Sequence, residues 1–211
     1  QKIEKRIAIT PEITKKYISL GFNVNLIHNY GVHLGFQNSH YENLGAKIIS
    51  DEKDLINNSD IVIQIRLPDD NQLSLMKENQ TLIGSLDSHE NKKKLKNLSN
   101  KKINIFSLEL LPRITRAQSM DILSSQANLA GYKAVIESFA FFEKAIPMMM
   151  TAAGTVPAAK VLVVGAGVAG LQAIATAKRM GAIVFATDVR MASKEQVESL
   201  GGKFLTVEGS E

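Results

Sequence analysis

The chain has 211 residues, 45% of them hydrophobic, and a formal net charge of +4. This length allows one large domain or two small ones, each with a real apolar core. The chain has no cysteine, which excludes disulfides, thiolate nucleophiles and thiolate-held metal clusters. We therefore expect no metal site, and any redox chemistry requires a borrowed cofactor.

Charge pattern and hydropathy argue against two kinds of partner. The basic run at residues 92–96 has no aromatic residues between its lysines, so it predicts a solvated helix face rather than a nucleic-acid interface. No apolar run approaches the roughly 20 residues needed to cross a bilayer, so we expect no direct membrane insertion. Because the chain begins with Gln1 and ends in a polar tail, we expect a fragment or a processed chain.

Short apolar segments alternate with helical ones through the first half of the chain. We expect a short strand before Thr10, a helix capped by Thr10 with Pro11 as its first residue, and a strand at residues 24–27. The later strands are expected at residues 46–49, 60–68, 81–86 and 103–110, with helices near residues 51–57, 73–78 and 90–98. This alternation predicts a parallel, doubly wound α/β sheet.

The turn signals become sparse after Arg116, and a long helix that joins two lobes is expected from there to about residue 144. Gly131 falls inside this helix and costs about 1 kcal/mol relative to alanine. A polar connector, "TAAGTVP", then leads to a second alternation. Its elements are expected to be a strand to Val164, a helix to about residue 180, a strand to Asp188, a helix to about residue 200 and a strand starting at Phe204.

Three glycines in this second alternation form a G-x-G-x-x-G motif. Gly165, Gly167 and Gly170 follow the apolar strand "KVLVV" and precede a helix, which is the context of a dinucleotide-binding loop. The first glycine permits the tight turn, the second lets a pyrophosphate approach the backbone, and the third lets helix and strand pack closely. Asp188 ends the next strand about 20 residues later, as the ribose-binding acid of such a fold should.

This acid favours one cofactor over another. A carboxylate at Asp188 accepts hydrogen bonds from both ribose hydroxyls and repels a 2′-phosphate, so NAD(H) is expected rather than NADP(H), although Arg190 could weaken that preference. A flavin-binding loop and a loop that binds nothing remain the alternatives. The expected fold is thus two Rossmann-like, doubly wound parallel-sheet lobes joined by a long helix. The N-terminal lobe covers residues 1–126 and includes the start of the helix, and the NAD-binding lobe covers residues 127–211 and is truncated at its C-terminus.

The long helix is expected to have one polar face that carries few charges. At 100° per residue one side of the helix holds Gln118, Asp121, Ser125, Asn128 and Tyr132, with Ser124 at its margin. The roughly opposite side holds Leu123, Ala127, Ala130 and Ala134. Amides, hydroxyls and a single carboxylate can fix a carboxamide and a ribose by directional hydrogen bonds. The alternative is an ordinary exposed face with Thr115 or Ser119 as the helix cap.

Several segments resemble a known family. "RIAITPE", "PRITRAQSMDILSSQANLAGYKAV", "MMMTAAGTVPAAKVLVVGAGVAGLQAIATAKRMGA" and "TDVRMASKEQVESLGGKF" are similar to the NAD(H)-binding part of the alpha subunit of proton-translocating NAD(P) transhydrogenase. The resemblance implies a homodimer that docks on a membrane-anchored proton channel and on a separate NADP(H)-binding domain. It also implies direct hydride transfer from NADH to NADP⁺, on the cytoplasmic face of a bacterial inner membrane or the matrix side of a mitochondrial one.

The resemblance also implies roles for individual residues. The nicotinamide end would be positioned by Arg113, Gln118, Asp121 and Ser124, with no classical acid or base. The run that borders this end would be Arg113, Ile114, Thr115 and Arg116. In the glycine loop Val168 would contact the dinucleotide, and the adenosine ribose would be held by Asp188, Val189 and Arg190.

Two other functions are kept as alternatives. An alanine dehydrogenase type of enzyme would need an arginine, a lysine and a histidine for its substrate; Arg6 matches that arginine, but Arg66 and Ser85 stand where the lysine and histidine would be. A non-catalytic NAD-binding module is the other alternative. Because the family's remaining NAD lobe lies beyond residue 211, we expect the chain as given to be inactive alone.

Overall fold

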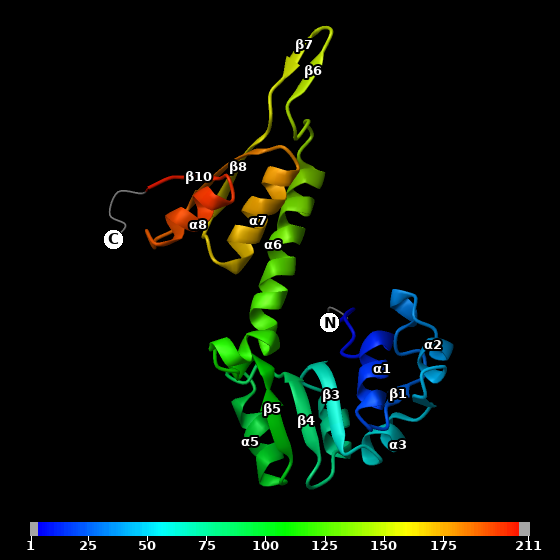
Figure 1. Ribbon diagram of the computed structural model, residues 1–211. Helices are drawn as coiled ribbons and strands as arrows, with labels where there is room; N and C mark the ends of the chain where they lie inside the picture. The colour runs from blue at the N-terminus through cyan, green and yellow to red at the C-terminus, as the bar shows by residue number, and fades with distance from the viewer. Residues whose placement is uncertain (1–3, 207–211) are drawn as a thin grey trace. The chain divides into compact units, whose positions relative to one another are not determined.

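A computed structural model describes residues 4–206, which belong to two compact units, Gln1–Met120 and Asp121–Glu211 (Figure 1). Both units contain parallel strands alternating with helices, which confirms the α/β class. The division between the units falls between residues 120 and 121, whereas the sequence placed it after residue 126. The long helix therefore lies entirely in the second unit. No helix within residues 4–206 has both the length and the apolar character needed to cross a membrane.

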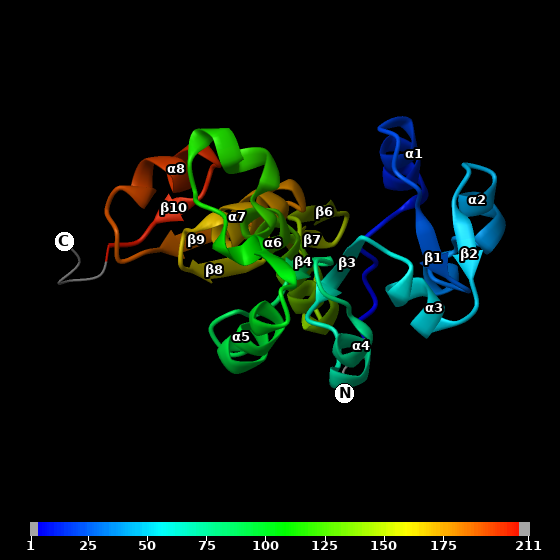
Figure 2. The ribbon, with the colours of Figure 1, turned by 90° about the horizontal axis from the view of Figure 1, so that it is seen from below.

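The first unit contains two separate parallel sheets. β1 (Asn25–Ile27) pairs with β2 (Lys47–Ile49), and Figure 2 shows these two strands side by side. The second sheet has three strands in chain order, β3 (Ile61–Arg66), β4 (Thr81–Ser85) and β5 (Asn104–Ser107). Each sheet has its own buried cluster: Val24, Leu26, Tyr41 and Ala46 at the first, and Ile56, Leu73, Met76, Leu82, Leu86, Leu98 and Ile103 at the second.

The helices of this unit mostly begin where the sequence indicates a cap. α1 (Pro11–Ser19) starts at Thr10, whose hydroxyl accepts from the Ile13 N–H, with proline as its first residue, as predicted. The remaining helices are α2 (Asn38–Glu42), α3 (Glu52–Asn57), α4 (Asp70–Leu75) and α5 (Lys92–Asn100), with short 3₁₀ turns η1 (Val32–Leu34), η2 (Leu108–Leu110) and η3 (Thr115–Met120).

The prediction of a short strand before Thr10 is wrong, since no strand forms there. The backbone of this segment is satisfied by two tyrosine side chains instead of a neighbouring strand. The Tyr30 hydroxyl accepts from the N–H groups of Ala8 and Ile9 at 2.9 and 3.1 Å, and the Tyr41 hydroxyl donates to the Ile9 carbonyl at 3.3 Å. Buried backbone groups need partners, and side chains can supply them as well as a sheet can.

The second unit is built on one long helix and a three-stranded parallel sheet. The sheet has the order β10 (Lys203–Phe204), β9 (Ile183–Thr187), β8 (Lys160–Val164). The helices are α6 (Ile122–Phe141), α7 (Val168–Arg179) and α8 (Ser193–Ser199). The core of this unit includes Val135 of α6, Ile174 and Ala177 of α7, and Val184 and Ala186 of β9.

The long helix begins later than expected. Residues 115–120 form η3, and the α-helix starts at Ile122 with Asp121 as its cap. Thr115 and Ser119 are therefore not the cap, and Gln118 does not lie on a face of the α-helix. The buried side of α6 runs through Gly131 and Val135, whereas Leu123, Ala130 and Ala134 are exposed.

A β-hairpin forms where a polar connector was expected. β6 (Met149–Thr151) pairs antiparallel with β7 (Gly154–Val156). The turn is closed by Thr151, whose hydroxyl donates to the Gly154 carbonyl and accepts from the Ala153 N–H. Gly154 has φ +135°, a conformation that favours glycine. The expected polar connector is therefore part of a hairpin, which the sequence did not predict.

Candidate functional site

The glycine motif forms a bend between β8 and α7. Gly165 follows the last residue of β8 with φ +96°, which an L side chain rarely adopts, and its N–H donates to the Thr187 carbonyl at 2.8 Å. Gly167 is the N-cap of α7 and has no side chain to cap it. A Cβ atom built on Gly167 would meet nothing within 4 Å. The first N–H groups of a helix lack intrahelical partners and attract anions, so this open bend fits a phosphate.

Two close backbone contacts fix the first turn of α7. A Cβ on Gly170 would lie 1.8 Å from the Gly165 carbonyl oxygen, and a Cβ on Gly131 would lie 2.0 Å from the Ala169 carbonyl oxygen. The third glycine of the motif thus does what was predicted for it. Gly131 was expected only to be tolerated in its helix, but its lack of a side chain is what lets α6 and α7 touch.

The Asp188 carboxylate lies against the glycine bend. Its Oδ2 accepts from the Ala166 N–H at 2.7 Å, and its Oδ1 accepts from the N–H and Nε of Arg190 at 2.8 and 3.0 Å. The Arg190 guanidinium, together with these backbone hydrogen bonds, holds the pKa of the Asp188 carboxyl well below its usual range. The acid is therefore ionised beside the glycine bend, where its side chain is 6% exposed. The side chain of Arg190 is 62% exposed and Val189 is 80% exposed.

Asp121 and Ser124 are brought together at the start of α6. Asp121 Oδ1 accepts from the Ser124 N–H at 2.9 Å, and Ser124 Oγ donates to Asp121 Oδ2 at 2.7 Å. Ser124 lies about 10 Å along the helix from Gly131, at 1.5 Å per residue. Figure 1 shows α6 beside α7 and continuing past the N-terminal end of α7. The predicted polar face therefore begins as a capping pair rather than as a free stripe.

The other residues predicted to position nicotinamide belong to the first unit. Arg113 and Ile114 are exposed on the turn that follows β5 and η2, and Thr115, Arg116 and Gln118 are exposed in η3. This turn is anchored by Ala117, which is buried and donates its N–H to the Ile114 carbonyl at 2.9 Å. The run thus leaves the carboxyl edge of the β3–β4–β5 sheet, where ligands of parallel α/β sheets bind.

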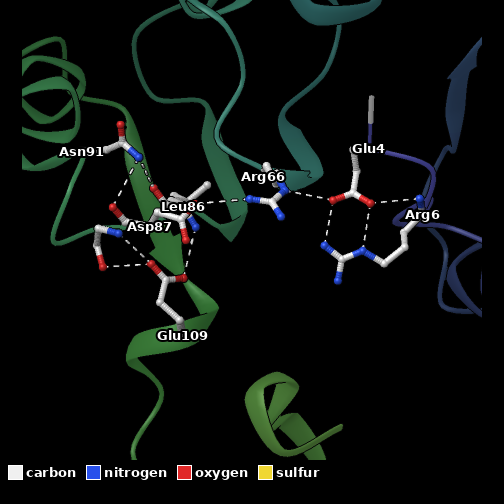
Figure 3. Close-up of polar contacts among 8 residues, drawn as sticks. Glu4, Arg6, Arg66, Leu86, Asp87, Asn91 and Glu109 are labelled. Carbon is white, nitrogen blue, oxygen red and sulfur yellow. Dashed lines mark hydrogen bonds and ion pairs between the residues drawn. The ribbon is translucent and has the colours of Figure 1, made fainter. Parts of the chain in front are cut away.

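The same edge carries a polar cluster that the sequence did not reveal (Figure 3). Glu109 accepts from the N–H groups of Leu86 and Ser88 and from the Ser88 hydroxyl. Although burial raises the pKa of the Glu109 carboxyl, these hydrogen bonds outweigh it and the net shift is downward. Glu109 therefore ties the end of β4 to η2, next to the exposed Arg113 turn.

The three positions compared with an alanine dehydrogenase site are also visible. Arg6 and Arg66 are both ion-paired to Glu4, and Ser85 is partly buried as the last residue of β4. A guanidinium and a hydroxyl do not replace the lysine and the histidine as proton-handling groups. These contacts give no support to proton-transfer chemistry in the first unit.

Two family models match consecutive stretches of the chain. Residues 1–130 match the alanine dehydrogenase/PNT N-terminal domain, and residues 134–211 match the alanine dehydrogenase/PNT C-terminal domain. An NAD(P) transhydrogenase subunit alpha chain of Rhodospirillum rubrum is 51% identical over 97% of this chain, and the corresponding chain of Rickettsia prowazekii is 46% identical over 98%. This chain spans 55% of the length of each of these relatives.

Solved structures agree with these matches. The transhydrogenase from Sinorhizobium meliloti superposes with a TM-score of 0.91 at 47% identity, over 98% of this chain and 62% of the other. An L-alanine dehydrogenase has the same fold, with a TM-score of 0.81 at 20% identity, over 97% of this chain and 58% of the other. The expected resemblance is confirmed, and the chain belongs to the alanine dehydrogenase/PNT family, with its high-identity matches among transhydrogenase alpha subunits.

Proposed function

We propose that this chain is the NAD(H)-binding part of a proton-translocating NAD(P) transhydrogenase of the Re/Si-specific type. In this proposal NADH binds to the chain, NADP⁺ binds to a separate partner domain, and hydride passes directly from one nicotinamide to the other. The observation that carries the proposal is the 2.7 Å contact between the Asp188 carboxylate and the Ala166 N–H. In this proposal Asp188 would accept hydrogen bonds from the ribose, and the open bend beside it would bind the pyrophosphate.

Roles for the site residues follow from the geometry and from the family. The pyrophosphate would lie at Gly165, Gly167 and Gly170, beside Val168 in the first turn of α7. The adenosine ribose would bind to the loop of Asp188, Val189 and Arg190. The nicotinamide end would be positioned by Arg113, Ile114, Thr115, Arg116, Gln118, Asp121 and Ser124.

In the proposed reaction these residues need only position the nicotinamide ring. NADH held by these residues would supply a hydride, with both bonding electrons, from a carbon of its nicotinamide ring to a carbon of the NADP⁺ ring. No proton moves at either carbon, so no side chain needs to act as an acid or a base. The protein contributes orientation and exclusion of water. A planar guanidinium such as that of Arg113 offers a fixed pair of donors to a carboxamide oxygen.

The proposal is tested by pairing the complete subunit with its NADP(H)-binding partner. We expect NADH-dependent reduction of an NADP⁺ analogue when both are present and none when the partner is left out. Oxidation of alanine by the purified subunit at a comparable rate would instead establish a dehydrogenase. If the subunit did not bind NADH in a fluorescence titration, both the transhydrogenase and the dehydrogenase hypotheses would be refuted.

We also infer a homodimer, and the β6–β7 hairpin supports it. Met148, Met149, Met150 and Val156 have exposed fractions of 61, 44, 82 and 36%. Flexible methionine side chains exposed together are typical of protein interfaces. Met150→Glu should therefore convert dimers to monomers in light scattering after size exclusion, whereas Met150→Leu should not. If Met150→Glu still formed a dimer as stable as that of the wild type, the hairpin would not be the dimer interface.

Association with a membrane would come from the partners. In a transhydrogenase complex the chain would sit against a proton-channel domain, on the cytoplasmic face of a bacterial inner membrane or on the matrix side in a mitochondrion. Flotation of the complete complex with membranes, and release of this subunit by mild salt, would support that location. If this subunit still floated with membranes after the channel domain was deleted, that location would be contradicted.

A further inference from the structure

The Glu109 carboxylate joins two segments of the first unit that are distant in sequence (Figure 3). Its Oε2 accepts from the Leu86 N–H at 3.1 Å. Its Oε1 accepts from the N–H and from the hydroxyl of Ser88, both at 2.9 Å. Hydrogen bonds to an ionised carboxylate are stronger than those to a neutral acceptor. Glu109 therefore fixes η2 firmly to the loop that follows β4.

The loop that Glu109 holds has a defined position of its own. Leu86 is fully buried in the apolar cluster of the three-stranded sheet. Asn91 Nδ2 donates to the Leu86 carbonyl at 2.9 Å, and the Asn91 N–H donates to the Asp87 carbonyl at 2.9 Å. Asp87 has φ +48° in this tight turn, which is uncommon for a residue other than glycine. The Glu109 side chain is thus bound to an extension of the core.

The exposed turn that carries Arg113 begins shortly after Glu109. Its own backbone hydrogen bonds are local, since the Ile114 N–H donates to the Pro112 carbonyl at 3.0 Å and the Ala117 N–H donates to the Ile114 carbonyl at 2.9 Å. Bonds between such near neighbours shape a turn, but they do not fix where it lies on the sheet. That position is set at the two ends, by the Glu109 carboxylate before the turn and by the buried Ala117 after it.

The place of the Arg113 guanidinium depends on the backbone of this turn. Arg113 is exposed, so close packing does not hold its side chain in position. A shift at the start of the turn is therefore passed on to the guanidinium. Misplacement of a positioning group by about 1 Å can slow a reaction by about 100-fold. Loss of the Glu109 contacts should thus matter for chemistry as well as for stability.

We propose that Glu109 is a positioning residue for hydride transfer and that it acts through Arg113. Its carboxylate fixes the start of the Arg113 turn to the end of β4, and this holds the guanidinium where it would orient the nicotinamide. The inference rests on the proposed function, to which it adds a residue outside the proposed cofactor contacts.

The test compares Glu109→Gln with the wild type, in the complete subunit together with its NADP(H)-binding partner. A glutamine amide has one acceptor oxygen and one donor nitrogen, so it cannot accept from both backbone N–H groups. We expect single-turnover hydride transfer from NADH to an NADP⁺ analogue to slow by about 10-fold. The Kd of NADH should change by less than about 2-fold, because its phosphates and adenosine ribose are proposed to bind the second unit.

A double variant shows whether Glu109 acts through Arg113. In an Arg113→Lys background, Glu109→Gln should slow transfer by less than about 2-fold, because the group that it positions has already been replaced. Losses that multiply in the double variant would overturn the proposal. A transfer rate that is unchanged in Glu109→Gln would also overturn it, as would a loss of NADH affinity as large as the loss of rate.

Asp51→Ala is the control for a loss of stability alone. Asp51 lies in the same unit and is also a carboxylate that accepts a backbone N–H, that of Asp54 at 3.2 Å, where it caps α3. Both Asp51→Ala and Glu109→Gln should lower the unfolding midpoint by a few degrees, but Asp51→Ala should keep the wild-type transfer rate. If Asp51→Ala lost as much transfer rate as Glu109→Gln, reduced stability would explain both losses and the positioning role would be refuted.

Two further measurements keep the outcome decisive. If Glu109→Gln does not fold, Ser88→Ala takes its place; it removes one of the three donors and should slow transfer by about 3-fold with unchanged NADH affinity, and a wild-type rate would refute the positioning role. The wild type tests the proposed function separately. No transfer by the wild type with its partner would refute the proposed function, whereas equal transfer by the wild type and Glu109→Gln would refute only the role of Glu109.

Discussion

Gly131 offers a test in which two known effects oppose each other. Replacement of a helical glycine by alanine normally stabilises a helix by about 1 kcal/mol. In α6, however, the new Cβ atom would lie 2.0 Å from the Ala169 carbonyl oxygen, and Cβ atoms are essentially never found closer than 3.0 Å to such an atom. The neighbour is backbone, so no side chain can rotate away. Gly131→Ala must therefore move α6 and α7 apart by about 1 Å at this point.

The size of the effect follows from that displacement. Overpacking of this kind costs about 1–3 kcal/mol, which matches or exceeds the gain in helix propensity, so the unfolding midpoint should fall by up to a few degrees. The first turn of α7 carries the N–H groups proposed to bind the pyrophosphate. A shift of about 1 Å in such groups can cost about 100-fold, and we expect NADH affinity to fall at least 10-fold.

The assay compares Gly131→Ala with Ala134→Ser, a control on the exposed side of the same helix. NADH binding is measured by fluorescence titration and stability by thermal unfolding. The control should change neither quantity appreciably. If Gly131→Ala raised the unfolding midpoint and left NADH affinity unchanged, helix propensity alone would govern the position and the close contact of α6 with α7 would be refuted.

Three further predictions concern individual side chains. Asp188→Ala should weaken NADH binding about 10-fold or more in a titration, because the Ala166 N–H and the ribose hydroxyls lose their shared acceptor; an unchanged affinity would remove Asp188 from the site. Arg113→Lys should slow hydride transfer by up to about 100-fold with little change in NADH affinity, because lysine lacks the planar pair of donors of a guanidinium. Equal losses of transfer rate and of NADH affinity would instead indicate a general role in binding. Glu109→Gln should lower stability by about 1 kcal/mol at pH 7. The pKa of Glu109 in the folded protein lies below its usual 4.5, so the difference in stability between the wild type and Glu109→Gln should disappear as the pH falls through and below that range. A difference in stability that persists in acid would show that the charge of Glu109 is not its source.

Patterns confined to neighbouring residues could be predicted from the sequence. The cap at Thr10 with Pro11 and the bend at Gly165 follow from local rules about backbone conformation, and the structure has both. The start of α6 was misplaced because a helical face was extended through residues 116–121. A signal was available there, since Asp121 followed by Ser124 is a capping arrangement, and the structure uses it as one.

Other features depend on partners that no local pattern identifies. Residues 6–10 have the composition of a strand, but hydroxyls of Tyr30 and Tyr41 take the place of a neighbouring strand. The hairpin at β6 and β7 was hidden because its turn is only two residues long and its strands only three. Short elements gain their stability from closure and packing rather than from propensity.

The two units also differ in how their polar sites are built, and this difference explains which site could be recognised. Around the bend of the second unit the decisive contacts involve backbone: Gly170 against Gly165, Gly131 against Ala169, and the Ala166 N–H against Asp188. Backbone contacts of this kind demand glycine at fixed spacing, so they leave a readable pattern. At the edge of the first unit the contacts join the ends of long side chains from distant segments, Glu4 with Arg66 and Glu109 with Ser88. Such contacts impose no spacing, which is why the partners of Glu4 and Glu109 became visible only in three dimensions.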